Sequence, residues 1–127
     1  MDDRSEILTL FAQWNTVLLS GDAGQVSALY SEDAILLPTV SNKIRHNRVE
    51  IEDYFEHFLL KKPDGQIMQH NIRRYNDLAI NSGIYYFTLK PAVGEVTVIK
   101  DRYTFVYRKM NGQWLIIEHH SSVFPEI

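Results

Sequence analysis

The sequence of 127 residues contains no cysteine. That absence excludes disulfide bonds, thiolate nucleophiles and every zinc or iron–sulfur site that depends on cysteine. Basic and acidic residues nearly balance, 13 against 16, for a formal net charge of −3, so we expect no nucleic-acid partner. Apolar runs stay far below the ~20 residues of a membrane-spanning helix, and we expect no membrane contact. Because the N-terminus lacks a signal-peptide pattern, we expect a cytoplasmic protein.

What remains is an ordinary globular composition, 45% hydrophobic and 23% charged. Domains average roughly 100–200 residues, so the length fits a single domain over residues 1–127. A chain of this size buries enough apolar surface to form a core without disulfide or metal staples. No internal repeat, linker or low-complexity segment divides it.

Hydrophobic spacing predicts helices in the first part of the chain. Apolar residues recur at helical spacing from Ile7 to Leu18, which predicts a helix over residues 3–20. Asp22 is placed to cap a short second helix, and Asn47 to cap a third. The helical period then disappears, and the rest of the chain reads as strands.

Alternating and aromatic-rich runs predict strands, separated by turn residues. The Asn111-Gly112 pair between the last two runs is typical of a type I′ hairpin turn. Helices followed by an antiparallel meander indicate an α+β fold whose helices cover one face of a curved sheet. We expect strands over residues 34–37, 66–75, 78–80, 84–89, 96–107 and 114–120.

Three groups of segments together carry a resemblance to a known family. They are FAQWN (11–15) with VSALYSEDA (26–34), LPTVSNK (37–43) with IEDYFEHF (51–58), and RYTF (102–105) with NGQW (111–114) and HHSS (119–122). In this combination the chain resembles the association (hub) domain of calcium/calmodulin-dependent protein kinase II. It resembles the free-standing bacterial proteins that carry this domain more closely still. Both belong to the NTF2-like, or SnoaL-like, superfamily.

The resemblance covers nearly the whole chain and implies a cystatin-like cone. In that fold three N-terminal helices, one long and two shorter, pack on a strongly curved antiparallel sheet. It also implies dimers, which in the kinase join into rings. The sequence lacks the glycine-rich loop, the Val-Ala-Ile-Lys strand and the His-Arg-Asp loop of a protein kinase, so we expect no kinase activity.

The resemblance implies a ligand pocket at the mouth of the cone, with its arginine and last histidine at Arg102 and His120. A strict two-residue hairpin puts these two residues on opposite faces of the sheet, whereas a β-bulge brings them to one face. We follow the family pattern and expect the bulge. The planar guanidinium of Arg102 suits a carboxylate, and His120 adds a second donor or accepts a proton.

A purely structural role is the alternative for these side chains, with Arg102 paired to Glu118 or Asp101. Glu118 stands where the kinase domain has a further histidine, which lowers the positive charge of the expected pocket. An anion would then bind there more weakly or in another way.

Two functions follow from the resemblance. The favoured one is a non-catalytic oligomerisation domain whose pocket binds a small carboxylate-type ligand. The alternative is a small SnoaL-like or ketosteroid-isomerase-like enzyme, an isomerase, cyclase or hydrolase that works by acid–base chemistry in the same cone. For either function the side chains expected at the site, besides Arg102, are Tyr30, Tyr54, Glu118 and His120.

Adjacent histidines such as His119 and His120 point to opposite faces of a strand, so they do not hold one metal ion together. We expect no metal and no cofactor. We do expect a homodimer, with a higher ring as a further step. Tyr103, Phe105 and Tyr107 alternate along one face of a strand, and we expect this aromatic face to lie outside and to pair two copies.

Overall fold

The computed structural model describes residues 3–125. None of the helices in this part of the chain is long and apolar enough to cross a membrane. The elements are α1 (Asp3–Ser20), α2 (Ala23–Ser27), β1 (Tyr30–Leu37), α3 (Arg48–Phe58), the 3₁₀ turn η1 (Leu59–Lys61), β2 (Pro63–Tyr75), β3 (Leu78–Leu89), β4 (Thr97–Met110) and β5 (Gln113–Val123).

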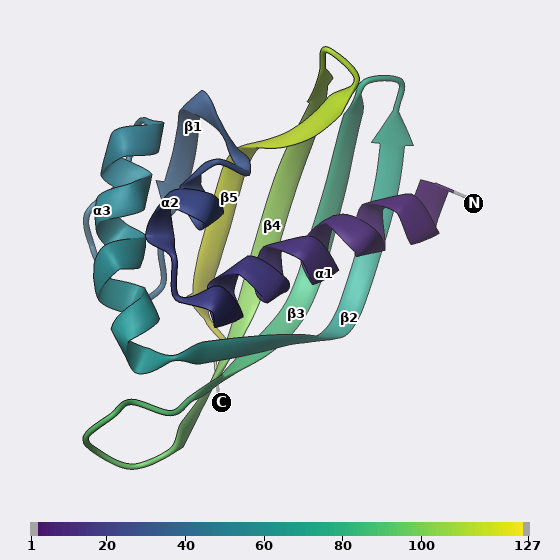
Figure 1. Ribbon diagram of the computed structural model, residues 1–127. Helices are drawn as coiled ribbons and strands as arrows, with labels where there is room; N and C mark the ends of the chain where they lie inside the picture. The colour runs from purple at the N-terminus through teal and green to yellow at the C-terminus, as the bar shows by residue number, and fades with distance from the viewer. Residues whose placement is uncertain (1–2, 126–127) are drawn as a thin grey trace.

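One five-stranded sheet forms the body of the molecule, in the order β1-β5-β4-β3-β2. The long helix α1 lies across the sheet, and α2 and α3 lie at the end where β1 is (Figure 1). The α+β fold is therefore confirmed. Strands β2 to β5 form the expected antiparallel meander, whereas β1 runs parallel to β5. A hairpin turn would make two paired strands antiparallel, but no such turn joins β1 to β5, because α3 and the strands β2 to β4 lie between them in the sequence.

Local interactions cap α2 and α3 and form the last hairpin turn where the sequence predicted, whereas β1 begins at Tyr30 and not at residue 34. The Asp22 carboxylate accepts hydrogen bonds from two backbone amides of α2, and the Asn47 side chain accepts one from the Glu50 amide of α3. Asn111 and Gly112 have φ values of +52° and +78°, as a type I′ turn requires. These caps and this turn depend only on neighbouring residues.

The two strands predicted over residues 78–80 and 84–89 are one continuous strand, β3. The irregularity lies opposite, in β2, where the register shifts between Ile67 and Gln69. Gly83 faces this bulge, and a Cβ there would overlap the backbone oxygen of Gln69. The glycine therefore serves a close approach of two backbones and not a turn.

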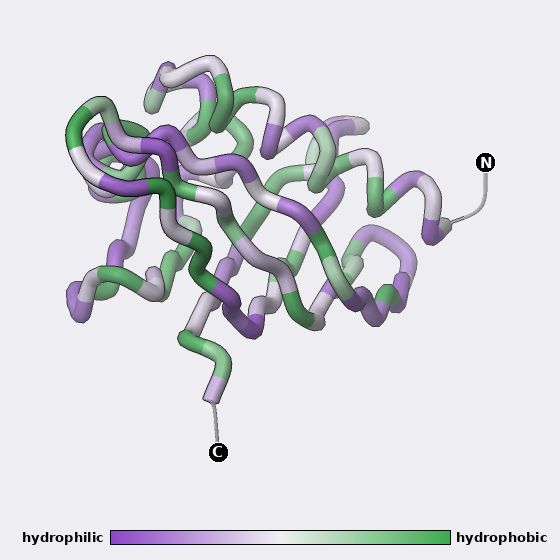
Figure 2. The backbone as a smooth tube through the Cα atoms, turned by 90° about the horizontal axis from the view of Figure 1, so that it is seen from below, coloured by the Kyte–Doolittle hydropathy of each residue, from purple (hydrophilic) through white to green (hydrophobic). Residues whose placement is uncertain are grey.

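Aromatic side chains fill the space between the sheet and α1. The ring of Trp14 packs edge-on against Phe105, with 5.4 Å between centroids, and Phe11 packs against the same ring at 6.1 Å. The expectation that the aromatic face of β4 lies outside is wrong, because Tyr103, Phe105 and Tyr107 are all buried on the helix side. Hydrophilic and hydrophobic residues alternate along the strands (Figure 2).

Gly83→Ala is expected to lower the free energy of unfolding by about 2 kcal/mol or more, because the added methyl group meets backbone and no flexible side chain. Urea denaturation measures the loss. Ser82→Ala, one residue earlier on the same strand, is the matched control and should cost less than about 1 kcal/mol. An equal loss of unfolding free energy in the two variants would contradict the prediction, because it would show that the β2 backbone shifts at its bulge without cost.

Candidate functional site

A small cavity lies inside the cone, between the sheet, α1, α3 and the segment that follows β1. Its volume is about 30 Å³, enough for a water-sized group. The wall is mostly aromatic and aliphatic, interrupted by one carboxylate and a few hydroxyl groups. The lining residues are Trp14, Leu36, Pro38, Thr39, Val40, Tyr54, Phe55, Phe58, Tyr85, Phe87, Ile99, Asp101 and Ser121.

The carboxylate in this cavity belongs to Asp101, on β4. It is 2% exposed, and burial raises its pKa from 3.8 to about 6, while the neighbouring Thr39 and Ser121 hydroxyls act in the opposite direction. Its Oδ1 atom is buried and has no hydrogen-bond partner among residues 3–125. A buried acceptor left open in a cavity is a place where a ligand or a reacting group gains a hydrogen bond.

A chain of buried polar groups runs beside the cavity through His119. The Tyr30 hydroxyl lies 2.8 Å from Nδ1 of this histidine, and the Tyr85 hydroxyl lies 3.1 Å from Nε2. Burial lowers the pKa of His119 to about 3, so the ring is neutral at physiological pH. The imidazole also stacks on Phe105, with 4.0 Å between ring centroids.

The hydrogen-bond balance assigns the proton of this neutral ring to Nε2. Trp14 donates its indole N–H to the Tyr30 hydroxyl over 3.2 Å, so Tyr30 is free to donate to Nδ1. Nε2–H then donates to Tyr85, which has the Ser121 hydroxyl as its further partner. The polar chain therefore leads from the indole of α1 to the hydroxyl groups beside Asp101.

Two of the predicted site residues lie on the inner side of the fold. Tyr54, on α3, lines the cavity, and burial raises the pKa of its hydroxyl well above the usual range. Tyr30 is fully buried at the start of β1, where its hydroxyl serves His119 and Trp14 and does not line the cavity. Of this pair, Tyr54 is the one in contact with the candidate site.

The other three predicted residues, Arg102, Glu118 and His120, are exposed on the outer face of the sheet. The expected bulge is present, because the register of β4 and β5 shifts between Val106 and Tyr107. It places Arg102 and His120 on one face, but that face turns away from the cone. A pocket at the mouth of the cone does not hold them in this structure; Arg102 instead lies over the ring of Phe124, 5.4 Å from its centroid.

Asp101, Ser121 and His119 were not selected from the sequence as site residues. The sequence of β4 did indicate Asp101, because Asp101, Tyr103 and Phe105 are alternate residues and so point to the same face of the strand. A carboxylate that continues an apolar row indicates a buried acid. Within residues 3–125, no three histidine, aspartate or glutamate side chains gather as metal ligands.

The family model of the calcium/calmodulin dependent protein kinase II association domain matches residues 3–125. The chain belongs to the association-domain family. A solved structure from Xanthomonas campestris, described as a candidate association domain of this kind, is 46% identical to this association domain, with a TM-score of 0.96. The match covers 100% of this chain and 91% of that chain. The resemblance seen in the sequence is confirmed.

Further solved structures share the shape of this association domain at much lower identity. An NTF2-like protein with a cystatin-like fold from Novosphingobium aromaticivorans is 17% identical, with a TM-score of 0.80 over 98% of this chain and 84% of that chain. A candidate scytalone dehydratase from the same species is 13% identical, with a TM-score of 0.83 over 94% and 82%. These matches show the fold, and no curated protein matches the chain.

The raised pKa of Asp101 predicts how Asp101→Asn changes stability with pH. Because the folded-state pKa is about 6 and the usual value is 3.8, ionisation disfavours the fold, and this loss develops as the pH rises from about 4 through 6. The variant should therefore gain about 1–2 kcal/mol relative to wild type between pH 4 and pH 7.5.

Urea denaturation at the two pH values measures this gain. Asp77→Asn, in an exposed turn, is the reference for the same chemical change. A stability difference between Asp101→Asn and wild type that is the same at both pH values would contradict the prediction.

Proposed function

We propose that this association domain is a self-association domain that pairs two copies through the outer face of its sheet. The observation that carries the proposal is the apolar character of that face. Its side chains alternate with the buried aromatic row, and in residues 3–125 all helices lie on the opposite side (Figure 1). The apolar residues on it include Ile80, Ile84, Tyr86, Val98, Val106 and Leu115.

The arrangement of these residues supports a twofold pair. Ile80 on β3 lies opposite Val106 on β4, so these two apolar side chains adjoin each other across the strands, whereas Ile84 and Tyr86 lie opposite Arg102 and Lys100. Val98, at the far end of β4, is 63% exposed. Contiguous apolar patches on a surface mark interaction sites, and a twofold axis lets one patch cover its own copy.

The predicted carboxylate site belongs to this same face. Arg102 pairs in register with Ile84, and His120 lies opposite Thr104. A small carboxylate held by Arg102 and His120 stays a prediction of the family resemblance. In this structure such a ligand would lie on the sheet surface that the second copy covers.

Ile84→Lys and Val98→Lys are expected to convert the dimer to a monomer, because each variant places an ammonium group in the apolar patch. Light scattering at micromolar concentration should show about twice the 14.8 kDa chain mass for the wild type and a single chain mass for the variants. A larger multiple for the wild type would indicate a ring.

The matched control is Val49→Lys, at an 80% exposed valine on α3 away from the sheet face. It should leave the wild-type mass unchanged. A wild-type monomer, or an equal loss of mass in the control, would contradict the proposed interface. Circular dichroism checks that the variants remain folded.

Asp101 supports a second candidate function, acid–base chemistry in the cavity. Its raised pKa of about 6 lets the carboxyl group accept or release a proton near neutrality, and its Oδ1 is open to a reacting group. The candidate dehydratase with the same fold fits this second function. The class of reaction is proton abstraction from a carbon next to a carbonyl group.

Hydrogen–deuterium exchange of acetone, the smallest ketone, tests this second function. Because the cavity of about 30 Å³ holds only a water-sized group, the side chains around it must move apart to admit the ketone. The ionised Asp101 would take an α-proton, leaving an enolate that recovers a deuteron from D₂O. Exchange followed by proton NMR should exceed the buffer rate, rise as the pH passes about 6, and disappear in Asp101→Asn. A wild-type rate equal to that of buffer, or one unchanged in the variant, would reject the assignment.

A further inference from the structure

A second hollow lies outside the cone, between α3 and the segment that joins it to β1. Its volume is about 340 Å³, within the usual size of small-ligand sites. Val40, Tyr54 and Phe58 line both this groove and the cavity of Asp101, so the two hollows lie back to back. The groove residues are Val40, Ser41, Arg45, Tyr54, His57, Phe58 and Lys61.

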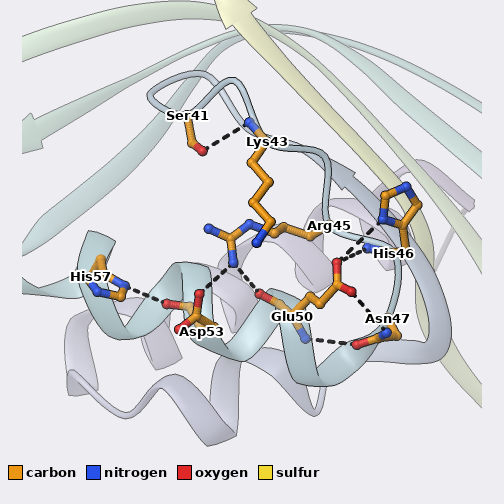
Figure 3. A network of polar contacts seen from close by, with 8 residues as sticks. All are labelled: Ser41, Lys43, Arg45, His46, Asn47, Glu50, Asp53 and His57. Atoms are coloured by element: carbon orange, nitrogen blue, oxygen red, sulfur yellow. Dashed lines mark hydrogen bonds and ion pairs between the residues drawn. The ribbon is translucent and has the colours of Figure 1, made fainter.

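The ionisable groups that line the groove, apart from the Tyr54 phenol, are all basic, namely Arg45, His57 and Lys61. Figure 3 shows Arg45 between the segment before α3 and the helix itself, with Asp53 on its α3 side. The Asp53 carboxylate lies 2.7 Å from Nη1 of Arg45, and its side chain is 54% exposed. Arg45 holds the pKa of Asp53 below its usual range, so this counter-ion is charged at neutral pH.

Arg45 is held rigidly and is not fully satisfied. Its backbone exchanges two hydrogen bonds with Leu36, and its Nη1 also donates to the Glu50 carbonyl over 3.0 Å. The residue is only 8% exposed, and its buried Nε has no hydrogen-bond partner among residues 3–125. An open donor on a buried guanidinium favours an oxyanion, since hydrogen bonds to charged groups are the strong ones.

The neighbouring polar groups add donors. His57 donates through Nδ1 to the Asp53 carbonyl over 2.8 Å, so Nε2 of the neutral ring is an acceptor, and the ring adds a donor for an oxyanion only as the imidazolium. The Ser41 hydroxyl accepts from the Lys43 amide and retains its own proton to donate. On the other side, Val40, Tyr54 and Phe58 supply an apolar wall. Basic donors facing an apolar wall suit a ligand with two unlike ends.

We propose that this groove binds a small organic oxyanion, a phosphate monoester or a carboxylate, whose apolar body rests on Tyr54 and Phe58. The acidic end faces Arg45 and Lys61. This site is separate from the cavity of Asp101, whose lining carries an acid and no base.

Isothermal titration of the full chain with phenyl phosphate tests the proposal, with benzoate as a second arm and benzyl alcohol as the neutral control. Phenyl phosphate should bind and benzyl alcohol should not. If benzoate binds as well, the groove recognises negative charge without distinguishing phosphate from carboxylate. If only phenyl phosphate binds, the groove recognises the phosphoryl group. Absence of phenyl phosphate binding to the wild type would overturn the site.

Matched lysine variants locate the binding. Lys61→Gln should weaken phenyl phosphate binding about threefold to fivefold, as expected for one partly exposed ion pair. Lys62→Gln removes the same charge one residue away, outside the lining, and should change the affinity less than twofold. Equal effects of the two variants would mean non-specific attraction and would overturn the proposal.

Asp53→Asn probes Arg45 without removing it. Freeing the guanidinium from its counter-ion should strengthen phenyl phosphate binding about threefold. Unchanged or weaker binding would remove Arg45 from the site. Asp101→Asn should leave the affinity unchanged, because Asp101 does not line the groove, so failure of the groove and failure of the cavity are distinguishable.

Discussion

A neutral histidine inside an aromatic core is the constraint on which the rest of the structure depends. Burial keeps His119 uncharged, and both of its ring nitrogens have tyrosine hydroxyl partners, from Tyr30 on β1 and Tyr85 on β3. Losing either partner would leave a buried polar atom unpaired, at a cost of about 1–3 kcal/mol. Because Trp14 of α1 bonds to Tyr30, one imidazole joins the parallel edge strand, the centre of the sheet and the long helix.

Because His119 faces the helices, the register of β4 and β5 fixes which side chains face the helices and which face outward. Phe105 is its register partner, so the aromatic row of β4 faces the helices with it. Asp101, in phase with that row, reaches the cavity and becomes the acid of the candidate site. Arg102 and His120, each next to an inward residue, are carried to the outer face, where the proposed dimer interface lies.

The segment between β1 and α3 has two chemical sides. Thr39 donates to Ser121 at the cavity over 2.6 Å, whereas Arg45 binds Asp53 on the groove side. Val40, between them, lines both hollows. The segment is therefore the common wall of an acidic cavity and a basic groove.

The sequence by itself determined the order of helices and strands and the family, and the family resemblance in turn implied the bulge. Caps at Asp22 and Asn47 and the turn at Asn111 depend on contacts within a few residues, so local reading predicts them. Parity separated Arg102 from the aromatic row of β4, and the family resemblance, through the expected bulge, put His120 on the face of Arg102. Only the tertiary structure decided which face of the sheet packs against the helices, because the alternation of side chains separates the two faces but does not show which one is buried. The aromatic rings of β4 pack beneath α1, and the mixed aliphatic and charged side chains of the other face lie at the surface.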